Sequence, residues 1–377
     1  MASTAVLTET IEPVANDAIS ALSERIRRAV RDRVPLAPRG GASKRWHPCT
    51  TTAAPLEIGP LSGIVLYEPT ELVITALAGT QLALIEERLA LEGQYLPFDP
   101  PHFGGATRAT PSTTLGGMVA AGFAGPGRLG AGGVRNYVLG TKLLNGRAEA
   151  LRFGGRVIKN VAGFDVARLL VGSMGSLGAI TEVSLKTLPL PRAEATLGFS
   201  LSEAEAVVAV NRWCGQPLPI AASAWCDGQL WLRLRGSEAG VTAAHTGLGG
   251  DVLSGPAAAT LWSGLRDQTD PWFVDTWSTP DAPARTLWRL TVPATTPPLS
   301  LPGDTLIEAG GATRWLKTTR APEDIHQEMY RLGGAACWFR GTQLPTPWFT
   351  PPNAAVLRVQ RAVKQAFDPD GIFPVIF

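Results

Sequence analysis

Pro38-Arg39-Gly40-Gly41-Ala42-Ser43-Lys44 is a loop of small residues that follows a strand-like run, and two similar loops occur downstream. The second is Thr114-Leu115-Gly116-Gly117, and the third spans Gly172-Ser173-Met174-Gly175-Ser176-Leu177-Gly178-Ala179-Ile180. Glycine lacks a Cβ atom, so backbone N–H groups in such loops can approach a ligand closely and form a concave anion site. Three such loops, each beside a predicted strand, indicate one long ligand that carries a diphosphate. A dinucleotide fits this description.

Composition sets the limits of the interpretation. The 377 residues suffice for two or three domains with a sizeable core. Charged residues make up only 18%, below the usual quarter. This is consistent with a large, well-buried enzyme or with a chain that another subunit partly covers. The formal net charge of +2 favours neither nucleic acid nor an acidic membrane surface as a partner.

The cysteines and the N-terminus indicate the compartment. The four cysteines stand far apart in the sequence, at Cys49, Cys214, Cys226 and Cys337. None forms a Cys-x-x-Cys pair, so we expect no metal site and no iron–sulfur cluster built by this chain alone. No signal peptide is evident, and no apolar run approaches the ~20 residues of a membrane span. We therefore expect a cytoplasmic protein without direct membrane insertion, and peripheral attachment at the inner membrane through partner subunits stays open.

Hydrophobic periodicity predicts the main elements. In the first half we expect a helix within 19–30, a second helix over 81–90 and a short helix over 164–171. Asn145-Gly146 between two strand-like runs predicts a hairpin of 138–144 with 148–153. The other expected strands of this half cover 34–37, 64–67, 72–76, 94–98 and 180–186. In the second half we expect strands over 230–234 and 288–292 and helices over 322–332 and 354–367.

One tempting motif is set aside. Gly125-Pro126-Gly127-Arg128-Leu129-Gly130 matches the Gly-x-Gly-x-x-Gly pattern of Rossmann dinucleotide sites. That mechanism requires a strand before the motif and a helix N-terminus after it. Here the motif contains a proline and is followed by Ala131-Gly132-Gly133. We interpret it as having no role in dinucleotide binding.

Several segments together carry a family resemblance. They lie in order along the first half, with one more near the C-terminus, at 36–41, 67–73, 96–103, 114–117, 134–140, 159–165 and 367–371. In these segments the chain resembles the FAD-binding fold of the vanillyl-alcohol oxidase and p-cresol methylhydroxylase superfamily. Pro100-Pro101-His102-Phe103 narrows the resemblance to the FAD-binding subunits of bacterial glycolate oxidase (glycolate dehydrogenase).

This resemblance implies an α+β fold, in which a two-subdomain FAD-binding domain of the p-cresol methylhydroxylase type is followed by a smaller α+β cap domain. Leu188-Pro189-Leu190-Pro191 marks the expected boundary, beyond which nine of the eleven tryptophans occur between Trp213 and Trp338. The expected parts are a flexible tail over 1–14, the FAD-binding domain over 15–190, the cap or interaction domain over 191–353, and a C-terminal helix and tail over 354–377 that returns to the FAD-binding domain.

The resemblance also implies the FAD contacts. The backbone of Arg39 to Ser43 corresponds to the family's pyrophosphate-binding loop, with Lys44 as a nearby counter-charge. Thr114 to Gly117 approach the pyrophosphate and ribityl chain from the other side, and the third loop runs from flavin to adenine, with the Ile180 backbone facing a base edge. The expected cofactor-binding residues are Pro38, Arg39, Gly40, Gly41, Ala42, Ser43, Lys44, Pro101, Thr113, Thr114, Leu115, Gly116, Gly117, Gly172, Gly175, Gly178 and Ile180.

Departures from the family refine this expectation. Ala42 stands where covalent members of the superfamily carry a histidine, so we expect FAD to bind without a covalent link, and His47 is interpreted as an ordinary polar residue. The 2-hydroxy-acid-oxidising relatives carry a Glu-His-Gly motif that this chain lacks. Its histidines are His47, His102, His245 and His326, none in that setting. Proton abstraction is usually performed by histidine, so we assign no catalytic base. Phe373-Pro374-Val375 replaces the family's Asn-Pro-Gly close, and 105–111 shifts the register of the contacts before Thr114.

The resemblance implies an oxidoreductase that uses FAD on CH–OH donors as one subunit of a complex. Its substrate would be a small 2-hydroxy acid, glycolate or also D-lactate. Its partners would be a larger flavoprotein subunit and an iron–sulfur subunit. Two alternatives stay open at this point: a stand-alone FAD-dependent oxidase or dehydrogenase of another hydroxylated small molecule, and a flavin-bound assembly subunit without catalysis.

Overall fold

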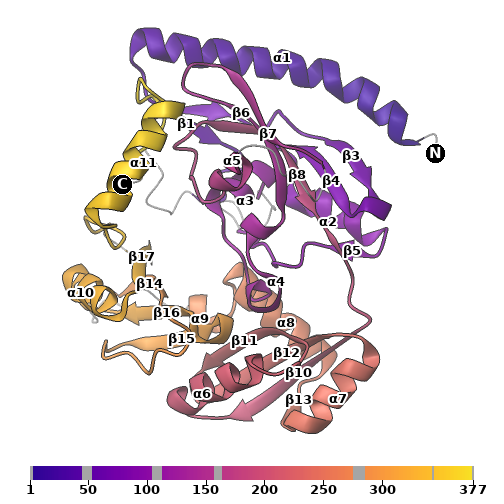
Figure 1. The fold of residues 1–377 in the computed structure, drawn as a ribbon, viewed down its shortest axis with the longest axis vertical. Coiled ribbons are helices and arrows are strands. Elements are labelled where there is room, and N and C mark those ends of the chain that lie inside the picture. The colour runs from indigo at the N-terminus through magenta and orange to yellow at the C-terminus, as the bar shows by residue number, and fades with distance from the viewer. Residues whose placement is uncertain are drawn as a thin grey trace.

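The computed structural model describes residues 3–44, 53–103, 113–156, 164–274, 285–341 and 344–375, with side chains from Val14 onward. Two sheets organise the chain, and Figure 1 shows them stacked along the long axis of the molecule. The chain crosses from the first sheet to the second between Lys186 and Ala193. Helices and strands mix in both parts, so the predicted α+β class is confirmed.

The first sheet is antiparallel, with the strand order β3-β4-β8-β6-β7. Its strands are β3 (Ile64–Glu68), β4 (Val73–Leu77), β8 (Ala179–Lys186), β6 (Val138–Leu144) and β7 (Ala150–Gly154). Every residue of β4 is buried, as expected for a strand covered on both faces. Two small sheets lie beside it, a parallel pair of β1 (Leu36–Arg39) with β2 (Ala54–Glu57) and an antiparallel pair of β5 (Gln94–Tyr95) with β9 (Leu188–Pro189).

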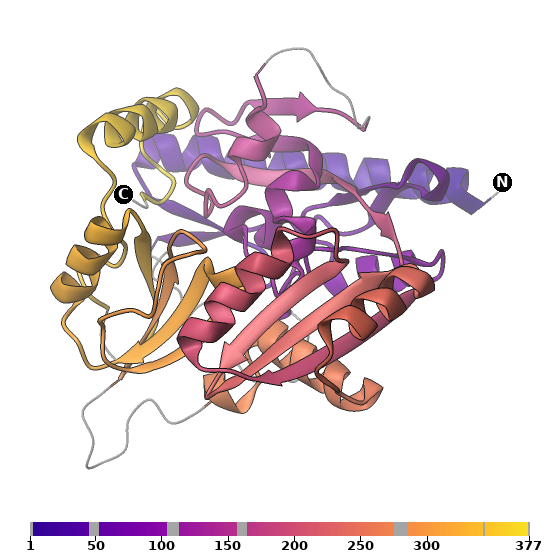
Figure 2. The ribbon, with the colours of Figure 1, turned by 60° about the horizontal axis from the view of Figure 1, so that its bottom comes forward.

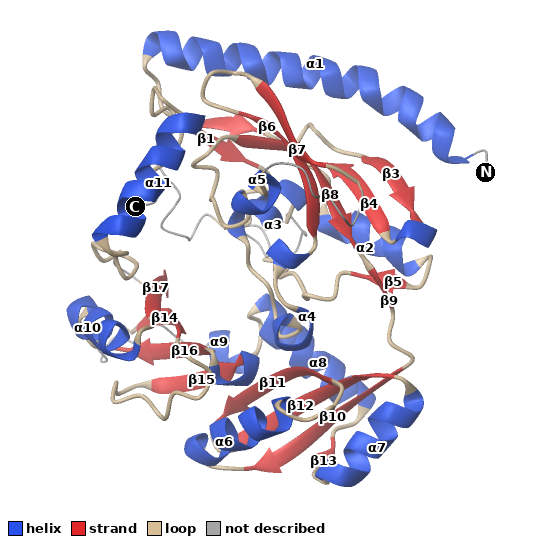
Figure 3. Cartoon of the chain, in the orientation of Figure 1, coloured by secondary structure: helices blue, strands red, loops and turns tan. Residues whose placement is uncertain are grey.

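Helices cover this sheet, as Figure 3 shows. The long helix α1 lies along the outside, and its Leu22, Ile26 and Ala29 enter the core. The helices and helical turns of this part are α1 (Ser3–Asp32), η1 (Pro69–Glu71), α2 (Leu82–Ala90), α3 (Leu115–Ala121), α4 (Arg128–Ala131), η2 (Val134–Asn136) and α5 (Val166–Leu169).

The second sheet, called the cap sheet below, has the strand order β13-β10-β12-β11-β15-β16-β14-β17 and is antiparallel throughout. Its strands are β10 (Ala193–Ser200), β11 (Ile220–Cys226), β12 (Gln229–Gly236), β13 (Asp251–Val252), β14 (Thr286–Thr291), β15 (Asp304–Glu308), β16 (Thr313–Thr318) and β17 (Ala335–Arg340). Its helices and helical turn are α6 (Glu203–Cys214), α7 (Glu238–Leu248), α8 (Gly255–Asp267), α9 (Pro271–Val274), η3 (Ala309–Gly311) and α10 (Pro322–Leu332).

The two faces of the cap sheet differ in what covers them. Figure 2 shows α6 and α7 on one face, where they pack on Leu197, Leu232 and Leu234. The α8 helix packs on the opposite face through Trp262 and neighbouring residues. Phe103 and Phe123 of the first part join that second cluster, so this face of the cap sheet looks toward the glycine loops.

The C-terminal helix α11 (Ala354–Phe367) leaves the cap and packs on the first part. Its Val363 and Phe367, and the tail residues Ile372 and Phe373, join the core of the first sheet. The backbone N–H of Leu36 donates to the carbonyl of Ile372 at 2.7 Å, which ties the tail to β1. Phe373 is thus a buried core residue in place of the family's Asn-Pro-Gly close.

Two expectations need correction. The segment 1–14, expected as a flexible tail, is helical from Ser3 onward. The helix continues through Pro13, although proline lacks the N–H group that a helix interior uses, so the local sequence gave no signal for a single helix from 3 to 32. The predicted hairpin is present, because β6 pairs with β7, but its loop is longer than an Asn-Gly turn. The left-handed residue of this loop is Ala148, with a φ of 60°, and not Gly146. Gly146 is required for another reason, because a Cβ at this position would lie 2.4 Å from Asp368 Oδ1.

Candidate functional site

The three glycine loops predicted from sequence surround one cavity of about 390 Å³. Its wall is built from backbone and small side chains, which is the surface that a long, phosphate-bearing ligand needs for close approach. The described lining residues are Ala37, Pro38, Arg39, Gly40, Gly41, Ala42, Ser43, Lys44, Ala53, Ile58, Thr114, Gly116, Gly117, Ala120, Ala121, Met174, Gly175, Gly178 and Ile180.

Direct contacts hold the loops together. A Cβ on Gly40 would lie 2.2 Å from Thr114 Oγ1, so the first and second loops meet only because Gly40 has no side chain. Gly175, at a φ of 78°, faces the ring of Pro38, where a Cβ would lie 3.3 Å from Cγ. The Met174 N–H donates to the Ala120 carbonyl at 2.8 Å, which joins the third loop to the helix that follows the second.

The loops differ in the hydrogen-bonding capacity that they leave for a ligand. In the second loop the N–H of Leu115 donates to Thr80, that of Gly116 to Ala78, and that of Gly117 to Thr114 Oγ1. In the first loop no N–H from 40 to 44 donates to another described residue. The first loop therefore has N–H groups that are free of described partners and can bind an anion. The N–H groups of the second loop are already bonded within the protein, so this loop contributes only the space for a ligand to approach closely.

Electrostatics also favour an anion. The described lining contains Lys44 and Arg39 and no carboxylate. Burial lowers the pKa of Lys44 to about 8, and its Nζ lies 3.3 Å from Ser43 Oγ and 5.6 Å from the centre of the Phe103 ring. Arg39 is already paired with Glu57 at 3.4 Å, and the two side chains are 36% and 52% exposed to solvent. Lys44 is thus the stronger candidate for a counter-charge.

Four of the expected contact residues, Pro101, Thr113, Leu115 and Gly172, are not among the residues that line the cavity. Leu115 points into the core, and Pro101 is buried beside the Phe103 segment. Thr113 is buried and donates to the Phe103 carbonyl at 3.3 Å. Gly172 turns at a φ of 82° and donates its N–H to Val119. His47, Cys49 and the segments 105–111 and 157–163 lie outside the described residues.

Sequence reasoning missed a charged cluster on the cap sheet. Arg289 of β14 lies 5.9 Å from the Trp315 ring centre, and burial together with Arg128 lowers its pKa. Trp315 donates to Glu308 at 2.6 Å, and burial raises the pKa of Glu308 to about 6. Arg289 and Glu308 belong to different strands, β14 and β15, so no sequence spacing could bring them together.

Aromatic rings connect this cluster to the glycine loops. Phe103, which lies beside Lys44, contacts Phe123 at 6.1 Å and Phe339 at 6.5 Å between ring centres. Phe339 contacts Trp315 at 4.7 Å, edge to face. These rings come from both parts of the chain. They form a continuous row of contacts that runs from the cavity at Lys44 to the Arg289 cluster on the cap sheet.

Comparisons with known proteins follow the same division. The family described as FAD binding domain matches residues 14–154. The glycolate oxidase subunit GlcE of Escherichia coli is 43% identical over 357 residues, which cover 95% of this chain and 96% of that protein. The chain belongs to the GlcE family of glycolate oxidase subunits. It is therefore an FAD-dependent oxidoreductase subunit, and the predicted cofactor is confirmed.

Other relatives match the GlcE-type chain over shorter stretches. The glycolate oxidase subunit GlcD of Bacillus subtilis is 30% identical over 167 residues, 44% of this chain and 34% of that protein. The D-lactate dehydrogenase of Archaeoglobus fulgidus is 31% identical over 191 residues, 48% of this chain and 39% of that protein.

A solved structure matches nearly the whole fold. Alkyldihydroxyacetonephosphate synthase aligns with 93% of this chain and 74% of its own, with a TM-score of 0.63 and 15% identity. This likeness concerns the fold alone. Within the described residues, no helix is long and apolar enough to cross a membrane.

Proposed function

We propose that this GlcE-type chain is the FAD-binding subunit of a complex that oxidises glycolate to its 2-oxo acid, with D-lactate as a further substrate. Its partners are a larger flavoprotein subunit and an iron–sulfur subunit that takes the electrons onward. The observation that carries the proposal is the cavity where three glycine loops meet beside Lys44. The identity to GlcE along 95% of the chain supports the same function.

The residues of the cavity fit the proposed group. The N–H groups of 40 to 44, free of other described partners, hold the pyrophosphate, and the Lys44 ammonium balances its charge. Gly116 and Gly117 would allow close approach from the opposite side, and the Ile180 backbone would face a base edge, since all three residues line the cavity. When bound, FAD supplies a two-electron acceptor for substrate oxidation.

Ala42 makes the binding non-covalent, because a methyl group cannot form the histidyl link of covalent relatives. Acid precipitation is therefore expected to release yellow FAD into the supernatant. Flavin retained in the pellet would contradict non-covalent binding, and FMN in the supernatant would contradict a ligand that spans all three loops.

The Arg289 cluster favours a second candidate, in which this chain oxidises a hydroxy acid by itself. Arg289 is desolvated, and its guanidinium has no ion pair within the described residues. A substrate carboxylate would supply the missing anion, since arginine binds carboxylates in a bidentate manner. Glu308, with a pKa of about 6, lies near enough to influence Arg289.

Dye reduction with glycolate, D-lactate and several polyols separates the two candidates. We expect the isolated chain to turn over poorly, because none of the described histidines, His102, His245 and His326, lines the cavity as a base. Activity is expected when the larger flavoprotein and iron–sulfur subunits are co-expressed with it. Rapid turnover by the isolated chain, abolished by Arg289→Met, would establish the stand-alone enzyme instead. Full activity of a complex that lacks this chain would refute both.

A further inference from the structure

The Gly-x-Gly-x-x-Gly motif at 125–130 serves close packing of backbone and not ligand binding. Its three glycines face backbone, not the cavity. A Cβ on Gly125 would lie 2.4 Å from the Asp99 carbonyl oxygen, one on Gly127 would lie 2.4 Å from that of Pro97, and one on Gly130 would lie 2.7 Å from that of Ile220. Ile220 belongs to β11 of the cap sheet. The motif is therefore a close-packed turn at the junction of the two parts.

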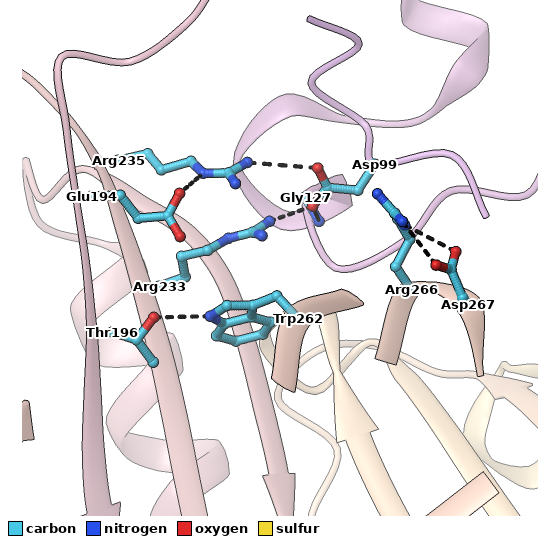
Figure 4. A network of polar contacts seen from close by, with 9 residues as sticks. All are labelled: Asp99, Gly127, Glu194, Thr196, Arg233, Arg235, Trp262, Arg266 and Asp267. Atoms are coloured by element: carbon cyan, nitrogen blue, oxygen red, sulfur yellow. Dashed lines mark hydrogen bonds and ion pairs between the residues drawn. The ribbon is translucent and has the colours of Figure 1, made fainter. Parts of the chain in front are cut away.

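Asp99 is the centre of this junction, and Figure 4 shows its partners converging on one carboxylate. Its Oδ2 accepts the Gly127 N–H at 3.0 Å and a hydrogen bond from Arg233 Nη2. Its Oδ1 lies 3.5 Å from Arg235 Nη1. Both arginines lie on β12 of the cap sheet. Asp99 holds a left-handed φ of 45°, which a non-glycine residue adopts only when its surroundings impose it.

The arginines are themselves fixed by the cap. Arg233, whose side chain is 3% exposed, lies 4.9 Å from the Trp262 ring centre, and Trp262 donates to Thr196 at 2.9 Å. Arg235 donates to Glu194 at 2.5 Å, as Figure 4 also shows. A buried arginine that loses its carboxylate is left with an uncompensated charge, so the Asp99 contact is strongly specified.

The segment that follows Asp99 is held by the cap a second time. The His102 N–H donates to Asp267 Oδ1 at 2.8 Å, while Arg266 pairs with the same carboxylate at 2.7 Å. The other end of His102, Nε2, lies 2.6 Å from Glu86 of α2. Phe103 comes next and lies beside Lys44 at the cavity. The five residues from Asp99 to Phe103 therefore carry both cap contacts and reach Lys44 at the glycine-loop cavity.

We propose that Asp99 and Gly127 are positioning residues that set the cap sheet, and with it Arg289, at a fixed place relative to the glycine-loop cavity. The inference rests on the proposed function and on the assignment of a substrate carboxylate to Arg289, since it assumes that substrate binds between Lys44 and Arg289. FAD contacts lie in the first part alone, whereas a substrate site between Lys44 and Arg289 needs both parts. Loosening the junction therefore weakens substrate binding and leaves FAD binding intact.

The test uses the co-expressed complex with Asp99→Asn, which keeps the side-chain shape and removes the charge. We expect the KM for glycolate to rise by about tenfold or more with a smaller change in kcat. The reason is that a displacement of Arg289 by a fraction of an ångström is enough to weaken its contact with the substrate. FAD content and the Kd for FAD are expected to stay within about twofold. Hydrogen exchange is expected to accelerate at the amides of 125–130 and of β12. Asp304→Asn is the matched control, because its exposed pair with Arg285 lies within the cap.

Each outcome decides the question. Unchanged exchange and KM in Asp99→Asn, or an equal loss of FAD, would overturn the positioning role. A wild-type complex without glycolate activity would contradict the proposed function, while the exchange rates would still test the junction. If Asp99→Asn does not fold, Arg235→Gln removes the 3.5 Å contact to Asp99 and the hydrogen bond to Glu194, leaves the Arg233–Asp99 hydrogen bond in place, and carries the same expectations. Gly127→Ala is expected to act in the same direction, because its Cβ meets the Pro97 carbonyl.

Discussion

The C-terminal tail connects the third glycine loop to β1, which leads into the first loop, and one buried lysine holds the tail in place. Lys364 Nζ donates to Asp368 Oδ2 at 2.5 Å, to the Ser176 carbonyl at 2.7 Å and to the Phe373 carbonyl at 3.0 Å. Ser176 belongs to the third glycine loop, and the same tail accepts the Leu36 N–H at the start of β1, which leads into the first loop. Lys364→Met therefore tests whether the tail supports FAD binding.

The structure sets the size of the effect. Lys364 and Asp368 are 8% and 2% exposed, so removing the ammonium leaves a buried carboxylate with only the N–H groups of Ile372 and Phe373 as donors. Breaking a buried pair in this way costs about 3–5 kcal/mol. If only about 1.4 kcal/mol of this reaches the loops, the Kd for FAD rises tenfold.

The assay is a fluorescence titration of the deflavinated chain with FAD, beside urea unfolding of the same protein. We expect Lys364→Met to raise the Kd at least about tenfold and to lower the free energy of unfolding. The double variant Lys364→Met/Asp368→Asn is expected to recover part of the stability, because replacing both partners of a buried pair costs less than removing one. Arg361→Met, at an exposed position of the same helix, is the control.

A wild-type Kd in Lys364→Met together with reduced stability would refute the reasoning, since the tail would then stabilise the fold without shaping the loops. An equal loss of FAD affinity in Arg361→Met would also refute it, because the effect would not depend on the buried pair.

Three further predictions follow from single groups. Because the pKa of Lys44 is about 8, FAD binding above that pH must take up a proton, and the Kd is expected to rise by up to about tenfold per pH unit. A Kd that depends on pH as little as that of Lys44→Met would contradict this. Burial raises the pKa of Glu308 from 4.5 to about 6, so the folded protein loses stability as the pH rises from about 4.5 to 6, and the loss stays constant above that range. Glu308→Gln is therefore expected to add about 1–2 kcal/mol at pH 7.5 and almost nothing well below pH 4.5, as measured by urea unfolding. Gly40→Ala places a Cβ 2.2 Å from Thr114 Oγ1 and is expected to weaken FAD binding about tenfold by titration, whereas Gly59→Ala, with open space around its Cβ, is expected to have no effect.

The sequence by itself determined the class of ligand and the loops that surround it. Small residues beside strands are a local property, so the loops at 38–44, 114–117 and 172–180 could be recognised without knowing how they meet. The helices over 322–332 and 354–367 were predicted at their observed bounds, because amphipathic periodicity is local as well. Rejecting the Gly-x-Gly-x-x-Gly motif as a Rossmann site needed only its neighbours.

Only the tertiary structure decided what depends on residues far apart in the chain. Gly146 looked like a hairpin residue and instead gives room to Asp368, and Gly116 is required by the close approach of Ala78, where a Cβ would lie 2.6 Å away. The junction at Asp99 joins residues 134 positions apart, and the order of the strands brings Glu308 close enough to Arg289 to influence its pKa. Such contacts arise from the packing of whole elements, and the distance along the chain between their partners leaves no local pattern from which they could be predicted.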